Sequence, residues 1–434
     1  MFRISRFHDV LKALPRGVFD RLVAEHGADK HSKRFGSWDH LVAMVYAQLA
    51  GVSSLRALET SFNSHPHQHY HLGTGPIRRS TLADANERRN TEVFAQVAHY
   101  LMAGVCRQLR RDGKELLYLL DSTTITLKGP GFDEWTLSNR TRSQGLKVHV
   151  LYAEQAAAPV HCSFSAANVN DIDEGRMLGI EPQATYVFDK GYYDFNWWSS
   201  LDAQKARFVT RFKSNVRLKV LAHREVPQQD RETILRDEEV SFSNRNPGGR
   251  RRNHYTQPLR RILVNRPGDE PPLSLATNDL SSPAAEIAER YRDRWRIELF
   301  FKWIKQHLKV RRFLGRSENA VRLQILCALI SYLLLNLYQR RTGTRQSLWM
   351  LMVEVQATLF QRPGLEAERY RRRQERIREI NLRQGQLLEA CRTAVRVRGN
   401  DGDGWAFQDD SGFPPHSGQA PSPACGRGLG RGRS

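Results

Sequence analysis

Two aspartates occupy positions where a carboxylate is costly, and they raise the first question about chemistry. Asp121 ends the apolar run "ELLYLLD", and Asp189 ends the apolar run "ATYVFD". Continuous apolar runs of this length predict buried strands of a sheet. A carboxylate at the end of such a strand needs a compensating cation, because an unpaired charge away from water raises the free energy of the folded state. A structural salt bridge to an arginine is one interpretation of each aspartate.

A third acid, Glu298, lies in the stretch "YRDRWRIELFFKWIKQHLK" at 291–309, which is predicted to form one helix. Helical geometry places Tyr291, Arg294 and Lys305 on the same face as this glutamate. The adjacent arc carries the apolar side chains, which predicts packing against a core: Ile297, Phe300, Phe301, Ile304 and Leu308. A solvated charged face is the simpler interpretation of the polar arc.

The three acids together permit a second interpretation, a metal site. Carboxylate oxygens are the ligands that Mg²⁺ and Mn²⁺ prefer, with positions left open for water and phosphate. Two such ions could activate the attacking oxygen and stabilise the leaving oxygen of a phosphoryl transfer. Arg294 and Lys305 would then lie where phosphate oxygens approach, and Tyr291 could donate a hydrogen bond to the same backbone.

The charge of the chain indicates a polyanionic partner. Lys and Arg number 67 against 46 Asp and Glu in 434 residues, so the net charge is +21 and the pI is near 10.1. Nucleic acid fits this balance best. The N-terminus has no apolar region followed by a cleavage site, so export is not expected. The five cysteines are far apart and support neither a disulfide framework nor a zinc knuckle, which favours a reducing cytoplasm.

The longest apolar run, at 323–338, is short for a membrane span and contains Gln324, Ser331 and Asn336. It is therefore predicted to be a buried helix, and no membrane partner is expected.

Residues 1 to about 80 predict short helices. The segments "WDHLVAMVYAQLAG" and "SSLRALETSF" have the rhythm of a helix-turn-helix, with Ser53 or Ser54 available as N-cap. Reading of DNA and an ordinary helical bundle are both open. Four alternating histidines follow, at positions 65, 67, 69 and 71. In an extended segment they would share one side and could bind a metal. A polar loop is the alternative, because neither cysteine nor carboxylate is near.

From about residue 115, apolar runs alternate with helical segments, which predicts a mixed α/β domain. The stretch 213–271 is polar, rich in arginine and turns, and carries short alternating pieces, so it is predicted to be a β-rich insertion. Beyond Gly399 the chain is rich in glycine and loses its periodicity, which predicts disorder.

Several motifs of the sequence together resemble those of one known protein family. The spacing Tyr291-x2-Arg294-x3-Glu298-x6-Lys305 resembles the Y-R-E-K signature of one large group of bacterial insertion-sequence DDE transposases. "LLDST" around Asp121 and "FDKGYY" around Asp189 resemble the two Asp motifs of that group, including D-x-G-Y. The first 75 or so residues resemble the helical domain found in one branch of the group, and the similarity covers about residues 2–345.

The resemblance implies a ribonuclease H-like catalytic domain with two Mg²⁺ or Mn²⁺ ions bound by the three acids. It assigns Tyr291, Arg294 and Lys305 to phosphates near the cleaved end. In the family, a metal-activated water cuts the strand at the element's end. The freed 3′-hydroxyl then attacks the opposite strand, giving a hairpin, or attacks target DNA. Members act as homodimers on double-stranded DNA, so "LLEACRTAV" at 387–395 is a candidate assembly element.

The resemblance and the patterns together predict an α/β fold with an α-helical N-terminal domain, a ribonuclease H-like domain interrupted by a β-rich insertion, and a helical C-terminal segment. The expected divisions are a DNA-binding domain at 1–80, the catalytic domain at 81–212 and 272–345, the insertion at 213–271, C-terminal helices that could serve dimerisation at 346–398, and the disordered tail at 399–434.

Other residues admit two interpretations. Trp197 and Trp198 could stack on an extruded base, or they could pack in the core. Arg250, Arg251 and Arg252 could bind phosphate or form a solvated charged loop. The glycine-rich tail departs from the family pattern and could be read-through sequence, which leaves open whether this copy is active.

The sequence thus predicts a cytoplasmic, nucleoid-associated enzyme that performs cut-and-paste transposition of an insertion sequence. It would bind terminal inverted repeats, cleave strands at the ends and transfer the 3′-hydroxyls to target DNA. Two alternatives remain: a structure-specific DNA endonuclease with the same metal chemistry, and a non-catalytic, element-derived DNA-binding repressor.

Overall fold

The structure is a computed structural model in which residues 1–363 form one compact unit and residues 364–434 a second. It describes residues 5–361 except 31, 112, 114, 139–142, 244–245, 247–251, 269 and 309–311, together with 376–377, 379–380 and 383–384. The predicted assembly segment at 387–395 and the glycine-rich tail at 399–434 lie outside the described residues.

One large mixed sheet organises the first unit, with the strand order β2-β3-β1-β5-β6-β10-β9-β8-β7 and β4 paired on β3. The strands are β1 (Leu117–Thr126), β2 (Leu137–Ser138), β3 (Gln144–Ala153), β4 (Ala158–Ala166), β5 (Thr185–Phe188), β6 (Arg207–Arg211), β7 (Leu218–Arg224), β8 (Ile234–Phe242), β9 (Leu259–Val264) and β10 (Leu273–Thr277). Strands β1, β3 and β4 form an antiparallel meander, and β5 and β6 continue it in parallel with β1. The α/β prediction is confirmed.

Parallel strands need crossover connections, and short helices provide them. Helix α8 (Asp171–Met177) precedes β5, and the 3₁₀ turn η1 (Lys190–Tyr192) and helix α9 (Phe195–Ala203) lie between β5 and β6. Strands β7, β8 and β9 fall inside 213–271, the stretch predicted to be a β-rich insertion, and β10 joins them edge to edge to β6. They therefore extend the main sheet rather than form a separate one. A second 3₁₀ turn, η2 (Gln228–Asp230), connects β7 to β8.

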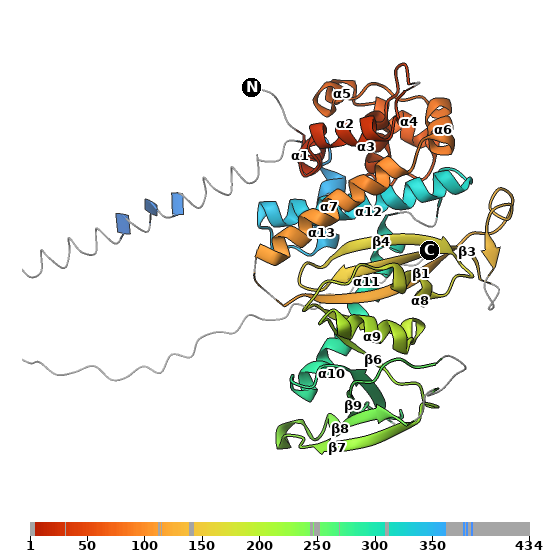
Figure 1. Ribbon diagram of the computed structural model, residues 1–434. Helices are drawn as coiled ribbons and strands as arrows, with labels where there is room; N and C mark the ends of the chain where they lie inside the picture. The colour runs from red at the N-terminus through yellow and green to blue at the C-terminus, as the bar shows by residue number, and fades with distance from the viewer. Residues whose placement is uncertain are drawn as a thin grey trace, which may run out of the picture. The chain divides into compact units, whose positions relative to one another are not determined.

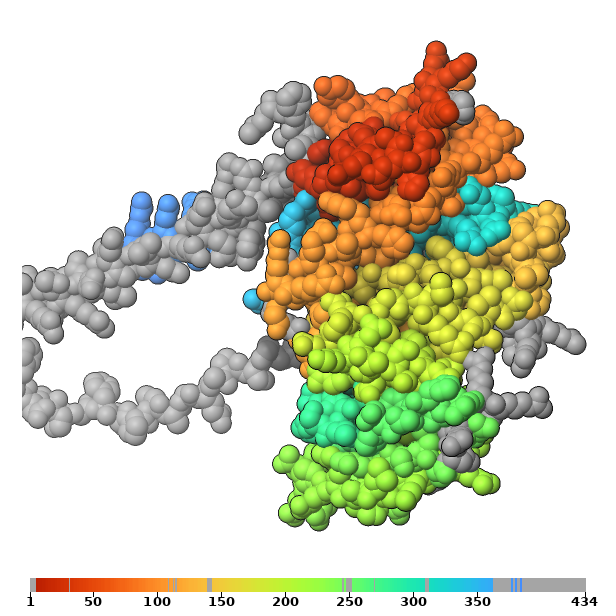
Figure 2. Space-filling view, viewed as in Figure 1, coloured from red at the N-terminus to blue at the C-terminus, as the bar shows by residue number. Residues whose placement is uncertain are grey.

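Helices gather at the other end of this unit (Figure 1). They are α1 (Arg6–Leu11), α2 (Arg16–Glu25), α3 (Ser37–Leu49), α4 (Leu55–Asn63), α5 (Pro66–Leu72), α6 (Arg79–Arg88) and α7 (Glu92–Arg111). Ser54 caps α4 by accepting a hydrogen bond from the Ala57 amide, as the sequence predicted for one of two serines. Figure 2 shows the same order on the surface, with the N-terminal helices at one end and β7 and β8 at the other.

The four alternating histidines lie in and beside helix α5, so both interpretations of this stretch, a polar loop and an extended metal-binding segment, are wrong. Pro66 starts the helix, and Gly73 ends it in the left-handed conformation at φ 64°. The His69 ring is buried and stacks on Phe62 with centroids 4.8 Å apart. Throughout the described part of the chain, no group of three His, Cys, Asp or Glu side chains is arranged to hold a metal ion.

The long apolar run belongs to α12 (Glu318–Thr342), which is long and apolar enough to cross a membrane but is a core helix here, with 89% of its apolar window buried. It packs between the N-terminal helices and the sheet. Its buried polar side chains all find backbone partners. Gln324 bonds the Leu314 amide and the Arg312 carbonyl, and Asn336 reaches the carbonyls of Ala156 and Ala157. The buried-helix prediction is confirmed, and α13 (Leu348–Ala357) packs beside it.

The predicted helix at 291–309 is divided in two. Helix α10 (Ala284–Asp293) and helix α11 (Trp295–His307) meet at Arg294, whose backbone keeps right-handed helical angles of φ −51° and ψ −29°. The interruption is therefore a single residue. The predicted apolar arc is buried: Ile297, Phe300, Phe301, Ile304 and Leu308.

Candidate functional site

Backbone register brings Asp121 and Asp189 together. Leu120 of β1 pairs with Phe188 of β5 in a parallel ladder, so the next residue of each chain segment is one of the two aspartates. Neighbouring strands lie about 4.8 Å apart, and equivalent positions in parallel strands point to the same face. The two apolar runs thus end side by side, each in an acid. Asp189 also accepts a hydrogen bond from the Gly191 amide at 2.7 Å, which fixes the turn after β5.

Helix α11 packs against β1 and presents Glu298 to the same place. Arg294 joins the two elements, since its guanidinium lies 2.6 Å from Glu298 Oε1 and 3.4 Å from Asp121 Oδ2. Both side-chain partners of this arginine are partly buried, which strengthens the interaction relative to an exposed pair. The sequence offered two interpretations of Asp121, a salt bridge to an arginine and a cluster with other acids. The structure shows both at once.

The surroundings of the Asp121 carboxyl disfavour its charged form. Burial raises its pKa to about 7, although the hydrogen bond from the Ser122 amide opposes the rise, and the negative charge of Asp189 raises it further. Arg294 lowers the pKa and Glu298 raises it by smaller amounts. A cation added beside this carboxyl would relieve the repulsion, which is the condition that a divalent ion would meet.

Lys305 follows Glu298 on α11, about two turns closer to the C-terminal end of the helix. Its ammonium is 2.5 Å from Thr123 Oγ1 and 3.2 Å from the Thr124 carbonyl oxygen of β1. An open hollow of about 410 Å³ lies between these elements. Its lining consists of Asp121, Ser122, Thr123, Glu298, Phe301, Lys302, Lys305 and Gln306.

Tyr291, the fourth member of the predicted signature, is buried rather than open to the hollow. Its ring centroid lies 5.8 Å from the Arg211 guanidinium carbon and 5.9 Å from that of Arg294. Burial raises the pKa of its phenol, and the two arginines oppose the rise. Its observed contacts are therefore with the side chain that holds Asp121 and Glu298.

The donor set fits a hard divalent cation in chemistry and charge, because Asp189 lies beside Asp121, and Asp121 and Glu298 share one compensating arginine. Their arrangement is not that of a closed metal cage. Among the described residues no three acids stand close enough to hold one ion together, and Glu298 is engaged by Arg294. Asp121, Asp189 and Glu298 are the residues that would hold such a cation.

Sequence reasoning missed a fourth acid beside the site. Asp171, the first residue of α8, accepts a hydrogen bond from Ser122 Oγ at 2.7 Å and pairs with Lys147 Nζ at 3.1 Å. His149 Nδ1 is 3.8 Å from the same carboxylate. The alternation in "LKVHVLY" carried part of the signal, because it puts Lys147 and His149 on one face of β3. The contact with Ser122 spans 49 residues and has no local signature.

The remaining predicted residues fall into three cases. Trp197 and Trp198 are buried, with Trp197 against Phe188 and Trp198 against Phe208 at centroid distances of 4.8 and 5.0 Å. This packing favours the core interpretation over base stacking. Arg252 is exposed, and its carbonyl accepts a hydrogen bond from Asn196 at 3.3 Å. Arg250 and Arg251 lie outside the described residues.

The raised pKa of Asp121 predicts how stability depends on pH without metal. The folded chain keeps a proton on this carboxyl that the unfolded chain, with a pKa of 3.8, has lost. Folding stability therefore falls as pH rises from about 4 to about 7. Relative to Asp121→Asn, the wild-type free energy of unfolding should drop by roughly 2 kcal/mol between about pH 5 and about pH 8. Urea unfolding in EDTA measures it, and a pH-independent difference would contradict the assignment.

Comparison with known proteins places this geometry in a family. The family model of the transposase DDE domain matches residues 112–334, about half of the chain, and a domain of unknown function (DUF4372) matches residues 3–75. A protein named "Putative transposase y4zB" of Sinorhizobium fredii is 42% identical over 66% of this chain and 78% of its own length. A probable transposase for insertion sequence element IS5377 of Geobacillus stearothermophilus is 26% identical over 59% of this chain and 66% of its own length.

Among solved structures, the piggyBac transposase synaptic complex with hairpin DNA aligns with 81% of this chain and 79% of that chain at a TM-score of 0.43 and 12% identity, and so distant a similarity carries no functional argument. The family model and the 42% identical relative establish the family to which this chain belongs. The antiparallel meander continued by two parallel strands, which carries the two aspartates at its centre, is the ribonuclease H-like sheet that was predicted. This chain belongs to the DDE-domain transposases, enzymes that transfer phosphoryl groups on DNA.

Proposed function

We propose that this transposase moves an insertion sequence by a cut-and-paste reaction, in which it cleaves the terminal inverted repeats and joins their 3′-hydroxyls to target DNA. The observation that supports the proposal most is the register of β1 and β5, which sets Asp121 beside Asp189 with Glu298 facing them across Arg294. The Y-R-E-K spacing of α10 and α11 is part of the same proposal.

The chain's own residues would bind and orient the DNA backbone. Two Mg²⁺ or Mn²⁺ ions, when bound by the three acids, supply activation of the attacking oxygen and neutralise charge on the leaving oxygen. Arg294 would exchange its carboxylate partners for a phosphate as the acids take up the cations. Lys305 lines the open hollow and would hold a neighbouring phosphate. Tyr291 would keep the Arg294 guanidinium in place and would reach phosphate only after a shift.

The partner is proposed to be double-stranded DNA in the bacterial cytoplasm, held by a homodimer that brings two ends together. The net charge of +21 supports a polyanionic partner. Helix α13 exposes Trp349, Met350 and Val353, which would suit an assembly surface. Arg250, Arg251 and Arg252 would add phosphate contacts from the β-rich insertion.

Incubation with end-labelled DNA that carries the inverted repeats tests this function. A transposase yields nicks at the repeat boundary that require Mg²⁺ or Mn²⁺, followed by products joined to a target plasmid. Nicks at branched DNA without joined products would favour a structure-specific endonuclease. Binding without any cleavage in either metal would favour a repressor and overturn the proposal.

Gly191 offers a test of the site's geometry. A Cβ at this position would lie 2.8 Å from Asp171 Oδ2 and 2.9 Å from Asp189 Oδ1, so alanine must push the carboxylates apart. Displacement of a reacting group by about 1 Å can cost on the order of a hundredfold in rate. Gly191→Ala should therefore lower the rate of DNA cleavage by roughly tenfold to a hundredfold.

The matched control is Gly179→Ala, because nothing lies within 4 Å of a Cβ built there. It should cleave at the wild-type rate. Both variants should bind the repeats and keep a cooperative thermal transition. Wild-type cleavage by a folded Gly191→Ala protein would show that Asp189 does not need its present position.

A further inference from the structure

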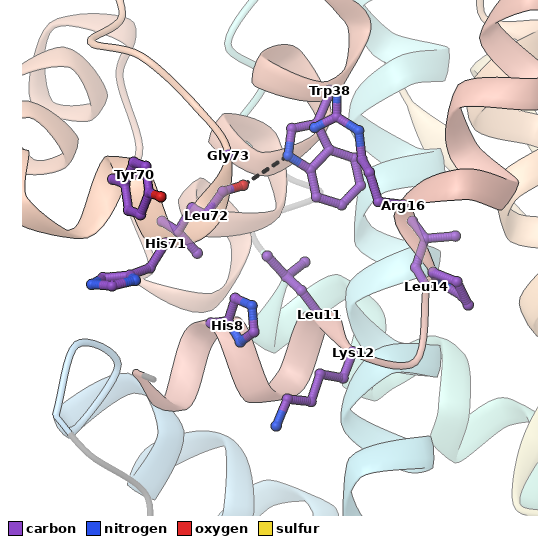
Figure 3. A pocket seen from close by; sticks show the side chains of 11 residues that line it. His8, Leu11, Lys12, Leu14, Arg16, Trp38, Tyr70, His71, Leu72 and Gly73 are labelled. Carbon is purple, nitrogen blue, oxygen red and sulfur yellow. Dashed lines mark hydrogen bonds between the residues drawn. The ribbon is translucent and has the colours of Figure 1, made fainter. Parts of the chain in front are cut away.

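Charged side chains of the first unit form pairs of two kinds, and those of Asp171 join separate elements. The hollow among the N-terminal helices shows the local kind (Figure 3). There Lys12 and Arg16 extend in opposite directions, and each pairs with an acid three or four residues away along the chain, Asp9 at 2.9 Å and Asp20 at 2.7 Å. Asp171 belongs to α8 but receives its contacts from β1 and β3. Contacts of this second kind fix how the elements lie relative to one another.

One carboxylate oxygen of Asp171 is bonded on the side of β1. Its Oδ1 accepts a hydrogen bond from Ser122 Oγ at 2.7 Å and lies 3.1 Å from Lys147 Nζ. The Ser122 amide donates to Asp121 Oδ1 at 2.8 Å. Ser122 therefore bonds Asp121 with its amide and Asp171 with its hydroxyl.

The other oxygen of Asp171 faces the turn that follows β5. A Cβ built on Gly191 would lie 2.8 Å from Asp171 Oδ2 and 2.9 Å from Asp189 Oδ1, so the two carboxylates flank the same glycine. Helix α8 comes this close to the turn because it carries a glycine of its own. A Cβ on Gly175 would lie only 3.0 Å from Cδ1 of Tyr192, which belongs to η1. Asp171 is thus packed against the turn that holds Asp189.

Asp171 reaches the two aspartates from the face of the sheet opposite to α11. Successive residues of a strand point to opposite faces. Asp121 and Thr123 point to the α11 face, where Lys305 bonds Thr123 Oγ1. Ser122 points to the other face, toward α8. Asp171 does not line the hollow that Asp121 and Lys305 share. It therefore supports the aspartates from behind.

We propose that Asp171 is a positioning residue of the transposase reaction. Its two oxygens hold the residue after Asp121 and the turn after Asp189, and so set the spacing at which these aspartates meet a divalent cation. The proposal rests on the proposed function, which assigns the cation to Asp121, Asp189 and Glu298. Loss of a partner that orients metal ligands typically costs roughly 10- to 100-fold in metal affinity or activity.

Binding of Mn²⁺ to the full chain without DNA tests the proposal apart from cleavage. The electron paramagnetic resonance signal of free Mn²⁺ measures the binding. Asp171→Ala should weaken it roughly tenfold to a hundredfold and raise the Mn²⁺ concentration for half-maximal nicking by a similar factor. Asp171→Asn should stay within about threefold of the wild type, because its amide oxygen can still accept from Ser122 and Lys147.

Ser122→Ala is a milder second variant, since it removes the hydroxyl and keeps the amide that bonds Asp121. It should also weaken Mn²⁺ binding, and it decides the question if Asp171→Ala does not fold. The two substitutions remove the same hydrogen bond, so the double variant should bind Mn²⁺ about as well as Asp171→Ala alone. The matched control is Asp173→Asn, a half-exposed acid of the same helix that pairs with Arg176 at 3.2 Å. It should bind Mn²⁺ like the wild type.

Three results would count against the proposal. Wild-type Mn²⁺ affinity in folded Asp171→Ala and Ser122→Ala would overturn it and leave the transposase function intact. Equal losses in Asp171→Asn and Asp171→Ala would also overturn it, because the charge of Asp171 and not its hydrogen bonds would then govern cation binding. A wild-type chain that neither binds Mn²⁺ nor nicks the repeats would contradict both this proposal and the proposed function.

Discussion

Asp121→Asn, Asp189→Asn and Glu298→Gln should each reduce DNA strand cleavage by at least about a thousandfold while binding of the same DNA persists. The first two side chains lie on neighbouring strands, Asp121 within β1 and Asp189 directly after β5, and the third faces them across Arg294. Each amide keeps the shape of the acid and removes the negative charge that a divalent cation needs. The rate of Mg²⁺-dependent nicking of labelled repeats measures the loss.

Asp121→Asn has an additional expected signature. It removes a charge that burial, and then repulsion from Asp189, disfavour in the folded chain, so the variant should be as stable as the wild type, or more stable, above neutral pH. Loss of cleavage with retained stability separates a catalytic role from a structural one. Glu289→Gln is the matched control, because Glu289 is an exposed acid of α10 that pairs with Arg292 at 3.1 Å on the same helix. A thousandfold loss in this control would mean that charge alone, not position, governs the rate.

Asp279→Ala should have the largest effect on stability, about 3 kcal/mol, because it removes a buried carboxylate that pairs with Arg290 and accepts hydrogen bonds from two serines at the turn into α10. Asp279 follows β10 and is almost completely buried. Its carboxylate lies 3.3 Å from Arg290 of α10 and 3.8 Å from Arg207 of β6. It also accepts hydrogen bonds from Ser281 and Ser282, which shape the turn into α10. The residue thus fixes the start of the helix that leads to Arg294.

The contribution of Asp279 should depend on pH in the opposite sense to that of Asp121. Burial disfavours its charged form, but the hydrogen bonds from Ser282 and Ser281 prevail and hold the pKa of Asp279 well below its ordinary value. Its stabilisation is therefore present above the unfolded pKa and is lost as pH falls toward the folded pKa. Urea unfolding should show a large difference between wild type and Asp279→Ala near neutral pH and a smaller one in acid.

Asp173→Ala is the control for this measurement, since Asp173 is a half-exposed acid paired with Arg176 on one helix. It should change the free energy of unfolding by less than about 1 kcal/mol. If Asp279→Ala were equally mild, the turn into α10 would be stabilised mainly by packing. Asp279→Ala should retain DNA strand cleavage when the rate is measured well below the melting temperature of the variant. Any loss would come from displacement of Arg294, because α10 leads to that residue.

The positions of the two aspartates could be predicted from the sequence, because local patterns mark both of them. Asp121 and Asp189 each end a continuous apolar run, and parallel pairing of such runs places their ends together. The apolar arc of α11 followed from helical period alone and is buried as expected. These features depend on residues within one element, where periodicity is informative.

Other features depend on contacts between distant segments and left little trace in the sequence. The pairing of Asp171 with Ser122 and Lys147 needs three elements to converge. The burial of Tyr291 between Arg211 and Arg294 turns a residue expected at the DNA into a support for an arginine. The alternating histidines left a polar loop and an extended segment as the two interpretations, but Pro66 and Gly73 define a helix there, because a proline at the start and a left-handed glycine at the end are helix-boundary signals.

The most direct test of the account is the joining of an element end to target DNA. A pre-cut repeat end with a free 3′-hydroxyl, a target plasmid and Mg²⁺ or Mn²⁺ are incubated with the purified chain, and junctions are sequenced. The wild type should give junctions in which the 3′-end is covalently joined to the target. The protein with Asp121→Asn, Asp189→Asn and Glu298→Gln combined should give none while still binding the end. Junctions formed by that folded triple variant would contradict the assignment of the three carboxylates to catalysis.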